Sequence, residues 1–267
     1  MRNQTTISLF KRVMGFVLVA ASATTFVSIG HAQERTPPPP GISFEVGAGA
    51  RYEPSYEGSS RYEVDPFPLF DFDYIRFRNG FQLGGRDDGG FSIQPSFDYK
   101  RKRSAGDDPV LTGLPDVDTS IELGLTAGYE FDHIKASLTG RYGVTGHNGF
   151  VGEAGLDLDF SPIDRLSVLA GPRLTFADSD YMNAYFGVSA ASAASSSFSA
   201  FNASGGIKSA GFEINTRYEL TENWAARGIF KWEHLLGDAA DSPITAVGDK
   251  NQFSAGIGLT RKFTLDF

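Results

Sequence analysis

The chain has 267 residues, of which 41% are hydrophobic and 21% charged, and its formal net charge at pH 7 is −8. After the N-terminal segment no stretch approaches the roughly 20 apolar residues of a transmembrane helix, which excludes a polytopic helical membrane protein. The acidic balance argues against a nucleic-acid partner, because a phosphate-binding surface needs a basic excess. The absence of cysteine excludes disulfides, cysteine-bound zinc and iron–sulfur clusters. The 31 glycines and 23 phenylalanines favour strands and turns over helices.

Residues 1–32 have the three parts of a secretory signal peptide. Basic residues precede an apolar stretch over residues 13–29, and Gly30 and Ala32 occupy the positions that a signal peptidase reads. We therefore expect cleavage after Ala32 rather than a membrane anchor. Residues 33–41 follow and contain four consecutive prolines. They are expected to form a periplasmic N-terminal spacer, either a stiff polyproline II segment or a disordered end of the mature chain.

From residue 42 onward apolar and polar residues alternate with a period of two, which is typical of half-exposed strands. Over residues 121–131, for example, Leu123, Leu125 and Tyr129 alternate with Glu122, Gly124 and Thr126. A soluble β-sandwich would alternate as well. The runs, however, are near the length of transmembrane strands, whereas soluble strands cluster at about 5–6 residues. The polar face carries charges of both signs and the apolar face often ends in aromatic residues, which together indicate a membrane-spanning barrel.

Tight turns at 87–90, 132–133, 161–164 and 221–223 alternate with longer connections, an asymmetry typical of outer-membrane barrels. The predicted fold is all-β, a closed antiparallel transmembrane β-barrel over residues 42–267. Because the predicted strand number, ten, is even, both termini are expected on the periplasmic side. The predicted strands are 42–52, 71–86, 91–101, 120–131, 134–142, 150–160, 165–176, 207–219, 224–235 and 251–267.

The segment 61–86 leaves an alternative open. Phe72 and Tyr74 share one phase of the alternation, whereas Phe77 and Phe81 follow the other. A β-bulge near Tyr74 would explain the change of phase. A separate hairpin at residues 78–80 would instead raise the count towards twelve.

The last strand alternates up to a terminal aromatic residue through Phe263, Leu265 and Phe267. Together with the signal peptide and the period-two runs, this pattern looks like the C-terminal signal that the barrel assembly machinery recognises. We therefore assign these three residues as an assembly signal.

Several segments resemble the MipA/OmpV family. The run from Val46 to Ser60 reads VGAGARYEPSYEGSS and is followed by a Pro-Phe-Pro at 66–68. Further similar segments are GHNGF at 146–150, DYMNAYFGV at 180–188 and LTENW at 220–224. The tract Ala190 to Ser199, almost entirely Ala and Ser, departs from the family pattern.

The resemblance implies an outer-membrane barrel without catalytic residues. It also implies a scaffold that links a lytic murein transglycosylase to a penicillin-binding synthase, whereas other family members are described as porin-like proteins or adhesins. The predicted function is accordingly a non-enzymatic scaffold of the cell outer membrane. The alternatives are a narrow porin-like channel for small solutes and a surface adhesin.

The chain offers little chemistry of its own. His133, His147 and His234 have no metal-binding spacing and are interpreted as ordinary surface residues. The pair Asp157 and Asp159 is interpreted as part of a lumen ion pair with Arg165 or Arg173, rather than a Ca²⁺ site. No catalytic residue, cofactor or metal is predicted.

A basic run of four residues begins the connection after the third predicted strand. It consists of Lys100, Arg101, Lys102 and Arg103. Such a cluster suits contact with the phosphates of lipopolysaccharide at the outer leaflet, and a solvated strand end is the alternative. The expected partners are therefore outer-membrane lipid, lipopolysaccharide and the barrel assembly machinery, together with the murein transglycosylase and penicillin-binding protein that the resemblance implies.

Overall fold

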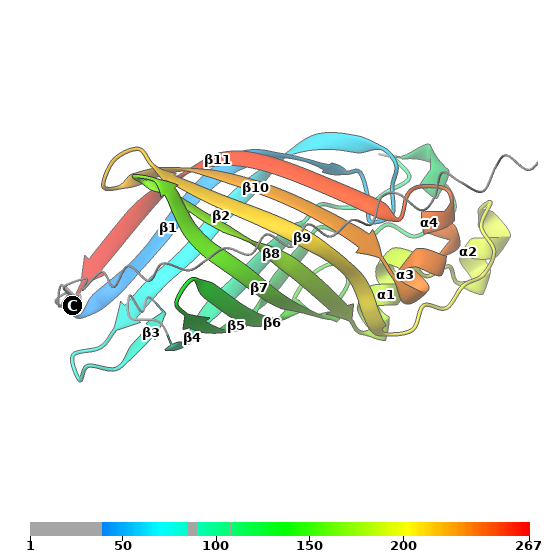
Figure 1. The fold of residues 1–267 in the computed structure, drawn as a ribbon. Helices are drawn as coiled ribbons and strands as arrows, with labels where there is room; N and C mark the ends of the chain where they lie inside the picture. The colour runs from blue at the N-terminus through cyan, green and yellow to red at the C-terminus, as the bar shows by residue number, and fades with distance from the viewer. Residues whose placement is uncertain (1–38, 85–89, 107) are drawn as a thin grey trace, which may run out of the picture. The chain divides into compact units, whose positions relative to one another are not determined.

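The strands form one curved antiparallel sheet in the computed structural model, which describes residues 39–84, 90–106 and 108–267 (Figure 1). Within these residues the order of the eleven strands is β3-β2-β1-β11-β10-β9-β8-β7-β6-β5-β4. Strands β2 and β3 also contact β4, so the sheet curls into a nearly closed barrel. The short strand is β3 (Gln82–Gly84). The long strands are β1 (Gly41–Pro54), β2 (Tyr62–Arg76), β4 (Gly90–Lys100), β5 (Ser120–Phe131), β6 (Ile134–Gly143), β7 (Phe150–Ile163), β8 (Leu166–Ala177), β9 (Gly206–Glu219), β10 (Trp224–Leu235) and β11 (Asn251–Asp266).

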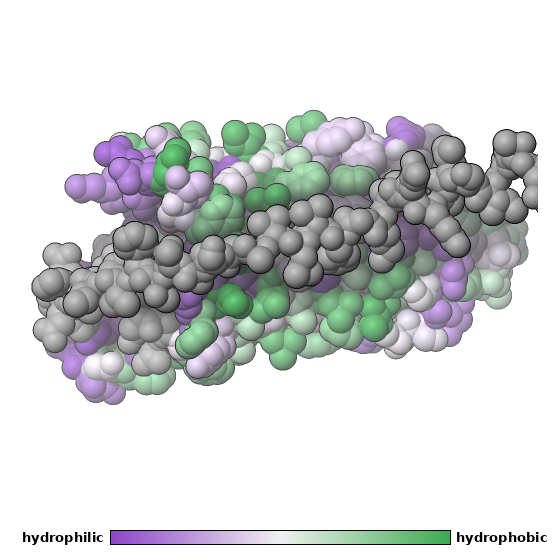
Figure 2. All heavy atoms as spheres, viewed as in Figure 1, coloured by the Kyte–Doolittle hydropathy of each residue, from purple (hydrophilic) through white to green (hydrophobic). Residues whose placement is uncertain are grey.

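The alternation of the sequence becomes the two faces of the barrel wall. Leu125, Leu138 and Ile257 point outward and are 59–69% exposed, whereas Glu122 on the inner face is fully buried. Figure 2 shows hydrophobic residues gathered over the strands in view and hydrophilic residues towards their ends. An apolar exterior flanked by polar ends is what a lipid bilayer requires of a barrel.

Nine of the ten predicted strands agree with the structure to within three residues, but the strand predicted over 71–86 is wrong. Strand β2 begins earlier, at Tyr62, and the chain turns at residues 77–81 before β3. Gly80 adopts a φ of +85° in this turn, which glycine tolerates without strain. The register with β1 shifts between Ser43 and Phe44, so Asp73 bulges. Both the bulge near Tyr74 and the extra hairpin therefore occur, and the described residues form eleven strands instead of ten or twelve.

The two ends of the barrel differ. Short turns join the strands at one end, here called the turn end, where Gly41 of β1 also pairs with Asp266 of β11. At the other end, the loop end, lie the helices α1 (Ser179–Phe186), α2 (Ala190–Ser195), α3 (Gly237–Asp241) and α4 (Pro243–Ala246) (Figure 1). No helix among the described residues is long and apolar enough to cross a bilayer. The predicted signal peptide, most of the spacer at 33–41 and most of the turn at 87–90 lie outside the described residues.

Candidate functional site: an ion-paired lumen beneath a loop cap

Ion pairs cross the lumen near the turn end. The Glu45 carboxylate of β1 lies 2.7 Å from Arg217 of β9 and 2.7 Å from Arg227 of β10. It also accepts a hydrogen bond of 2.7 Å from Thr260 of β11. Glu45 is only 6% exposed. Because β9 and β1 are not neighbours in the sheet, the pair with Arg217 spans the interior instead of following the wall.

A second network fills the middle of the lumen. Arg173 of β8 pairs with Asp157 of β7 at 2.8 Å and with Glu213 of β9 at 3.3 Å. The predicted pairing of Asp157 with an arginine across the hairpin is therefore confirmed, with Arg173 as the partner. Lys231 of β10 joins Glu153 of β7 at 3.3 Å and thereby connects strands three positions apart.

At the loop end, the Glu57 carboxylate interacts with three donor groups. Glu57, in the loop between β1 and β2, lies 2.8 Å from the Lys100 Nζ and 3.2 Å from the Lys208 Nζ. The Tyr181 hydroxyl donates to the same carboxylate. Burial by itself would raise the pKa of Glu57, but the two ammonium groups outweigh it and hold that pKa well below its usual range. Burial and the Glu57 carboxylate together raise the pKa of Tyr181, so its hydroxyl stays a donor.

His147 belongs to this interior, so its interpretation as a surface residue is wrong. Its imidazole is 5% exposed, lies 3.1 Å from the Glu122 carboxylate through Nε2, and accepts from the Gly149 N–H through Nδ1. Both ring nitrogens therefore have structural partners. His133 lies in the exposed turn between β5 and β6, and His234 bonds to Asn251. No group of residues in the described ranges is arranged to hold a metal ion.

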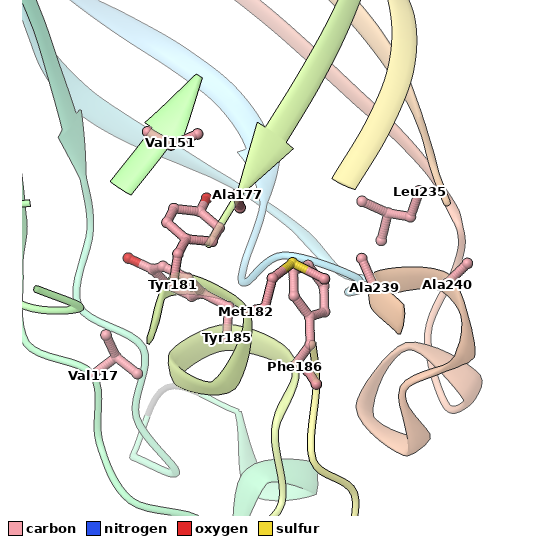
Figure 3. Close-up of a cluster of buried hydrophobic side chains, with 11 residues drawn as sticks. Val117, Val151, Ala177, Tyr181, Met182, Tyr185, Phe186, Leu235, Ala239 and Ala240 are labelled. Atoms are coloured by element: carbon pink, nitrogen blue, oxygen red, sulfur yellow. The ribbon is translucent and has the colours of Figure 1, made fainter. Parts of the chain in front are cut away.

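The loops at this end pack into a small apolar core. We call the segments 101–119, 178–205 and 236–250 the loop cap. One cluster contains Tyr181, Met182, Tyr185 and Phe186 of α1 with Leu235 and Ala239 beside them (Figure 3). A second cluster joins Leu111 to Ile244. Such packing holds the loops in one arrangement.

Two of the segments that carry the family resemblance meet at the loop end. His147 packs edge-on against Tyr181 with ring centroids 4.7 Å apart. The Asp178 carboxylate accepts from Tyr181 N at the start of α1 and from Phe150 N at the start of β7. A side chain at Gly149 would collide with the backbone of Tyr181. The GHNGF and DYMNAYFGV segments therefore form one structural unit.

The structure does not gather the basic run into one exposed patch. Lys100 pairs with Glu57, and Arg101 pairs with Glu63 and Asp65. Arg103 is 4% exposed and donates to the Tyr185 carbonyl oxygen. The Lys102 side chain is 44% exposed and pairs with Asp116. Contact of this run of four residues with lipopolysaccharide stays a prediction.

Of the residues assigned as an assembly signal, Phe263 and Leu265 lie on the outward face of β11, and Phe267 follows directly after that strand. Phe263, Leu265 and Phe267 are 38%, 57% and 48% exposed. Phe263 stacks on Phe44 of β1, and Phe267 contacts Phe77 edge-on. Their part in assembly stays a prediction.

Sequence reasoning missed two members of the interior, Glu57, which looked like a loop residue, and Lys208, at the beginning of a strand. The signal that could have found them is the aromatic segment 180–188, because aromatic residues within a long polar loop are typical of a packed core.

Comparison with known proteins gives one family match and several similar structures. The sequence model of the MipA family, described as MltA-interacting protein, matches residues 46–263. Comparison with curated proteins finds no significant match. Among solved structures, the N-terminal β-barrel domain of Pseudomonas aeruginosa OprF is 17% identical, with 66% of this chain and 100% of that chain covered and a TM-score of 0.29. An outer membrane channel from Pseudomonas putida F1 is 9% identical over 86% and 98% of the two chains, with a TM-score of 0.40.

The family match begins within β1 and ends within β11, so it covers the loop cap and the barrel wall apart from the turn-end residues of these two strands. The exterior is apolar, as insertion into the outer membrane requires. The chain therefore belongs to the MipA, or MltA-interacting protein, family and is a β-barrel of the outer membrane.

Proposed function

We propose that this chain is a non-enzymatic scaffold that binds a murein transglycosylase of the MltA type at the periplasmic side of the outer membrane. A penicillin-binding synthase would be the second enzyme of the assembly. The family description, MltA-interacting protein, carries this proposal. The interior supports it, because ion pairs cross the lumen and the loop cap covers one end, which suits a rigid anchor.

The hairpin between β2 and β3 is the best candidate for the docking surface. Phe77 and Phe81 flank its turn, are 39% and 55% exposed, and lie with ring centroids 6.0 Å apart. Aromatic anchors of this kind often dominate protein interfaces. The other connections at the turn end are short and offer little surface. A stable interface buries about 800 Å² per partner, and the hairpin adds to the area available there.

The proposal is tested with the refolded barrel in nanodiscs and a purified transglycosylase of the MltA type on a biosensor. Replacing both aromatic residues, Phe77→Ser with Phe81→Ser, should weaken binding at least about tenfold. The matched control is Val247→Ser at the loop end, where the valine is 53% exposed. Absence of binding by the unaltered barrel would refute the scaffold, and binding that survives the double substitution would refute the hairpin as its docking surface.

A narrow channel is the second candidate function. It is favoured by the charged inner face and by a cavity of about 150 Å³ at the loop end. The ion pairs across the lumen oppose it, because a barrel of this size is nearly filled by its own side chains.

A further inference from the structure

One charged residue lies on the lipid-facing surface of the barrel wall. Arg261 of β11 is exposed, and its ladder partners are Val46 of β1 and Trp224 of β10, which are 43% and 44% exposed on the apolar face. Along the strands that the structure describes, Arg261 is the one Asp, Glu, Lys or Arg residue on this outward face. A charge on the lipid face destabilises a barrel by an amount that depends on its depth, so the depth and the partner of Arg261 decide its role.

Two aromatic rings hold the guanidinium group of Arg261. Its central carbon lies 5.9 Å from the ring centroid of Trp224 and 5.2 Å from that of Phe263. Such cation–π contacts use the faces of the rings and leave the N–H donors of the guanidinium available. Within the described ranges Arg261 forms no ion pair, whereas its neighbour Lys262 faces the lumen and pairs with Asp73. Arg261 therefore presents a positioned cation with unused donors to the membrane.

Arg261 lies level with the rim of the barrel at the turn end. The N–H of the next residue, Lys262, donates to the Asn223 carbonyl oxygen in the turn between β9 and β10. Trp224, opposite Arg261, is the first residue of β10. Tryptophan at such a rim is typical of the girdle at the headgroup level of the bilayer. Short turns of outer-membrane barrels face the periplasm, so this level is that of the periplasmic leaflet, which consists of glycerophospholipids.

The surroundings of Arg261 match such a lipid in both parts. A planar guanidinium binds phosphate oxygens through two parallel hydrogen bonds. Towards the middle of the membrane the same face of β11 is apolar, with Leu259 and Ile257 51% and 69% exposed. A zwitterionic headgroup carries an ammonium that neutralises its own phosphate, whereas a net-negative headgroup does not. The unpaired cation therefore favours a lipid with net negative charge.

We propose that Arg261 forms, with Trp224 and Phe263, a binding site for an anionic glycerophospholipid of the periplasmic leaflet. The lipid phosphate accepts hydrogen bonds from the Arg261 guanidinium at the rim. The acyl chains lie along the outward face of β11 over Leu259 and Ile257. This inference does not depend on the scaffold function, because it concerns the lipid-facing wall and not the surface on which an enzyme would dock.

Quenching of Trp224 by brominated lipid tests the proposal. The chain has two tryptophans, so Trp232→Phe leaves Trp224 as the reporter beside Arg261. This protein is refolded in phosphatidylcholine vesicles that contain increasing fractions of phosphatidylglycerol or phosphatidylcholine brominated near the glycerol. Phosphatidylglycerol should bind about fivefold more tightly than phosphatidylcholine, the effect expected of one basic side chain near a membrane surface. Glycerol phosphate in solution, which lacks the acyl chains, should not relieve the quenching.

Substitutions in the same background identify the residue responsible. Arg261→Gln should abolish the preference for phosphatidylglycerol, and Arg261→Lys should keep part of it, because the charge remains without the paired donors. The matched control is Arg165→Gln, which removes an equal charge from the exposed turn between β7 and β8 at the same end and should keep the full preference. Equal quenching by the two lipids, a preference that survives Arg261→Gln, or relief of quenching by glycerol phosphate would overturn the proposal.

Discussion

The Arg217 guanidinium of β9 lies 2.7 Å from the Glu45 carboxylate of β1, although β10 and β11 separate the two strands in the sheet. This ion pair crosses the lumen between strands that are not neighbours in the sheet. Arg227 adds a second contact to the same carboxylate, and the Lys231–Glu153 pair crosses further along the barrel. Charges of opposite sign on the inner face therefore neutralise one another.

Removing the centre of the turn-end network should destabilise the barrel. In Glu45→Gln two guanidinium groups lose their shared carboxylate, and breaking a buried pair costs roughly 3 kcal/mol. The free energy of unfolding, measured by urea titration in lipid vesicles, should fall by about that amount. Glu219→Gln is the matched control, because its side chain contacts the same Arg217 but is 51% exposed. It should cost less than about 1 kcal/mol, and equal losses in the two variants would contradict the buried network.

Liposomes containing the unaltered barrel should not swell in small sugars or amino acids. The ion pairs across the lumen and the loop cap should block the passage of solutes through the barrel. Replacing Glu45, Arg217 and Arg227 together by Ala should not be enough to admit solutes, since the loop cap still covers the other end. A further Phe186→Ala, which loosens that cap, should produce measurable swelling. Swelling of the unaltered barrel with a sharp size limit would instead establish the channel.

The loop cap should lose stability in acid through Glu57. Its pKa is held below the usual range in the folded state, so its contribution is complete above the unfolded value of about 4.3 and is lost as the pH falls towards the folded value. The thermal midpoint of the unaltered barrel should therefore fall more steeply below about pH 4.3 than that of Glu57→Gln. Glu222→Gln, in the exposed turn before β10, should retain the steep fall. Parallel profiles for Glu57→Gln and the unaltered barrel would count against this carboxylate.

Phe186 should hold the loop cap together. Its side chain is fully buried in the cluster around α1, and removal of a buried phenylalanine ring costs about 3–5 kcal/mol. In Phe186→Ala, trypsin should cut faster after Lys102 and Arg103 while the strands stay protected. Leu123→Ala removes a lipid-facing side chain of the barrel wall, 49% exposed, and should leave the cutting rate unchanged.

The C-terminal aromatic pattern should act in assembly rather than in stability. Leu265→Ser with Phe267→Ser should reduce the folded, heat-modifiable form in cell membranes, because the assembly machinery would read the signal poorly. Phe253→Ser, at the loop end of the same face of β11 and 46% exposed, is the control. Equal folded yields in all three proteins would remove the assembly assignment.

Local pattern explains why most of the strands were predictable and one was not. Strand β5 follows strict alternation, and its predicted bounds agree with the structure. Strand β2 begins with a segment that contains Glu63, Asp65 and two prolines. This composition is typical of a loop, because a central strand does not tolerate proline. In the structure, β2 contacts β4 without backbone hydrogen bonds between the two strands. This side of β2 is therefore a sheet edge, where the prolines cost no hydrogen bond. That fact depends on which strand lies beside it, which the local sequence does not contain.

The sequence by itself determined the alternating strands, the apolar exterior, the family and the pairing of Asp157 across its hairpin, because each depends on residues near one another in the chain. Only the tertiary structure decided that Glu57 meets Lys100 and Lys208, that His147 is buried against α1, and that β2 and β4 face each other without a ladder. These contacts join segments far apart in sequence. They depend on how the nearly closed barrel brings distant strands together, which no local periodicity specifies.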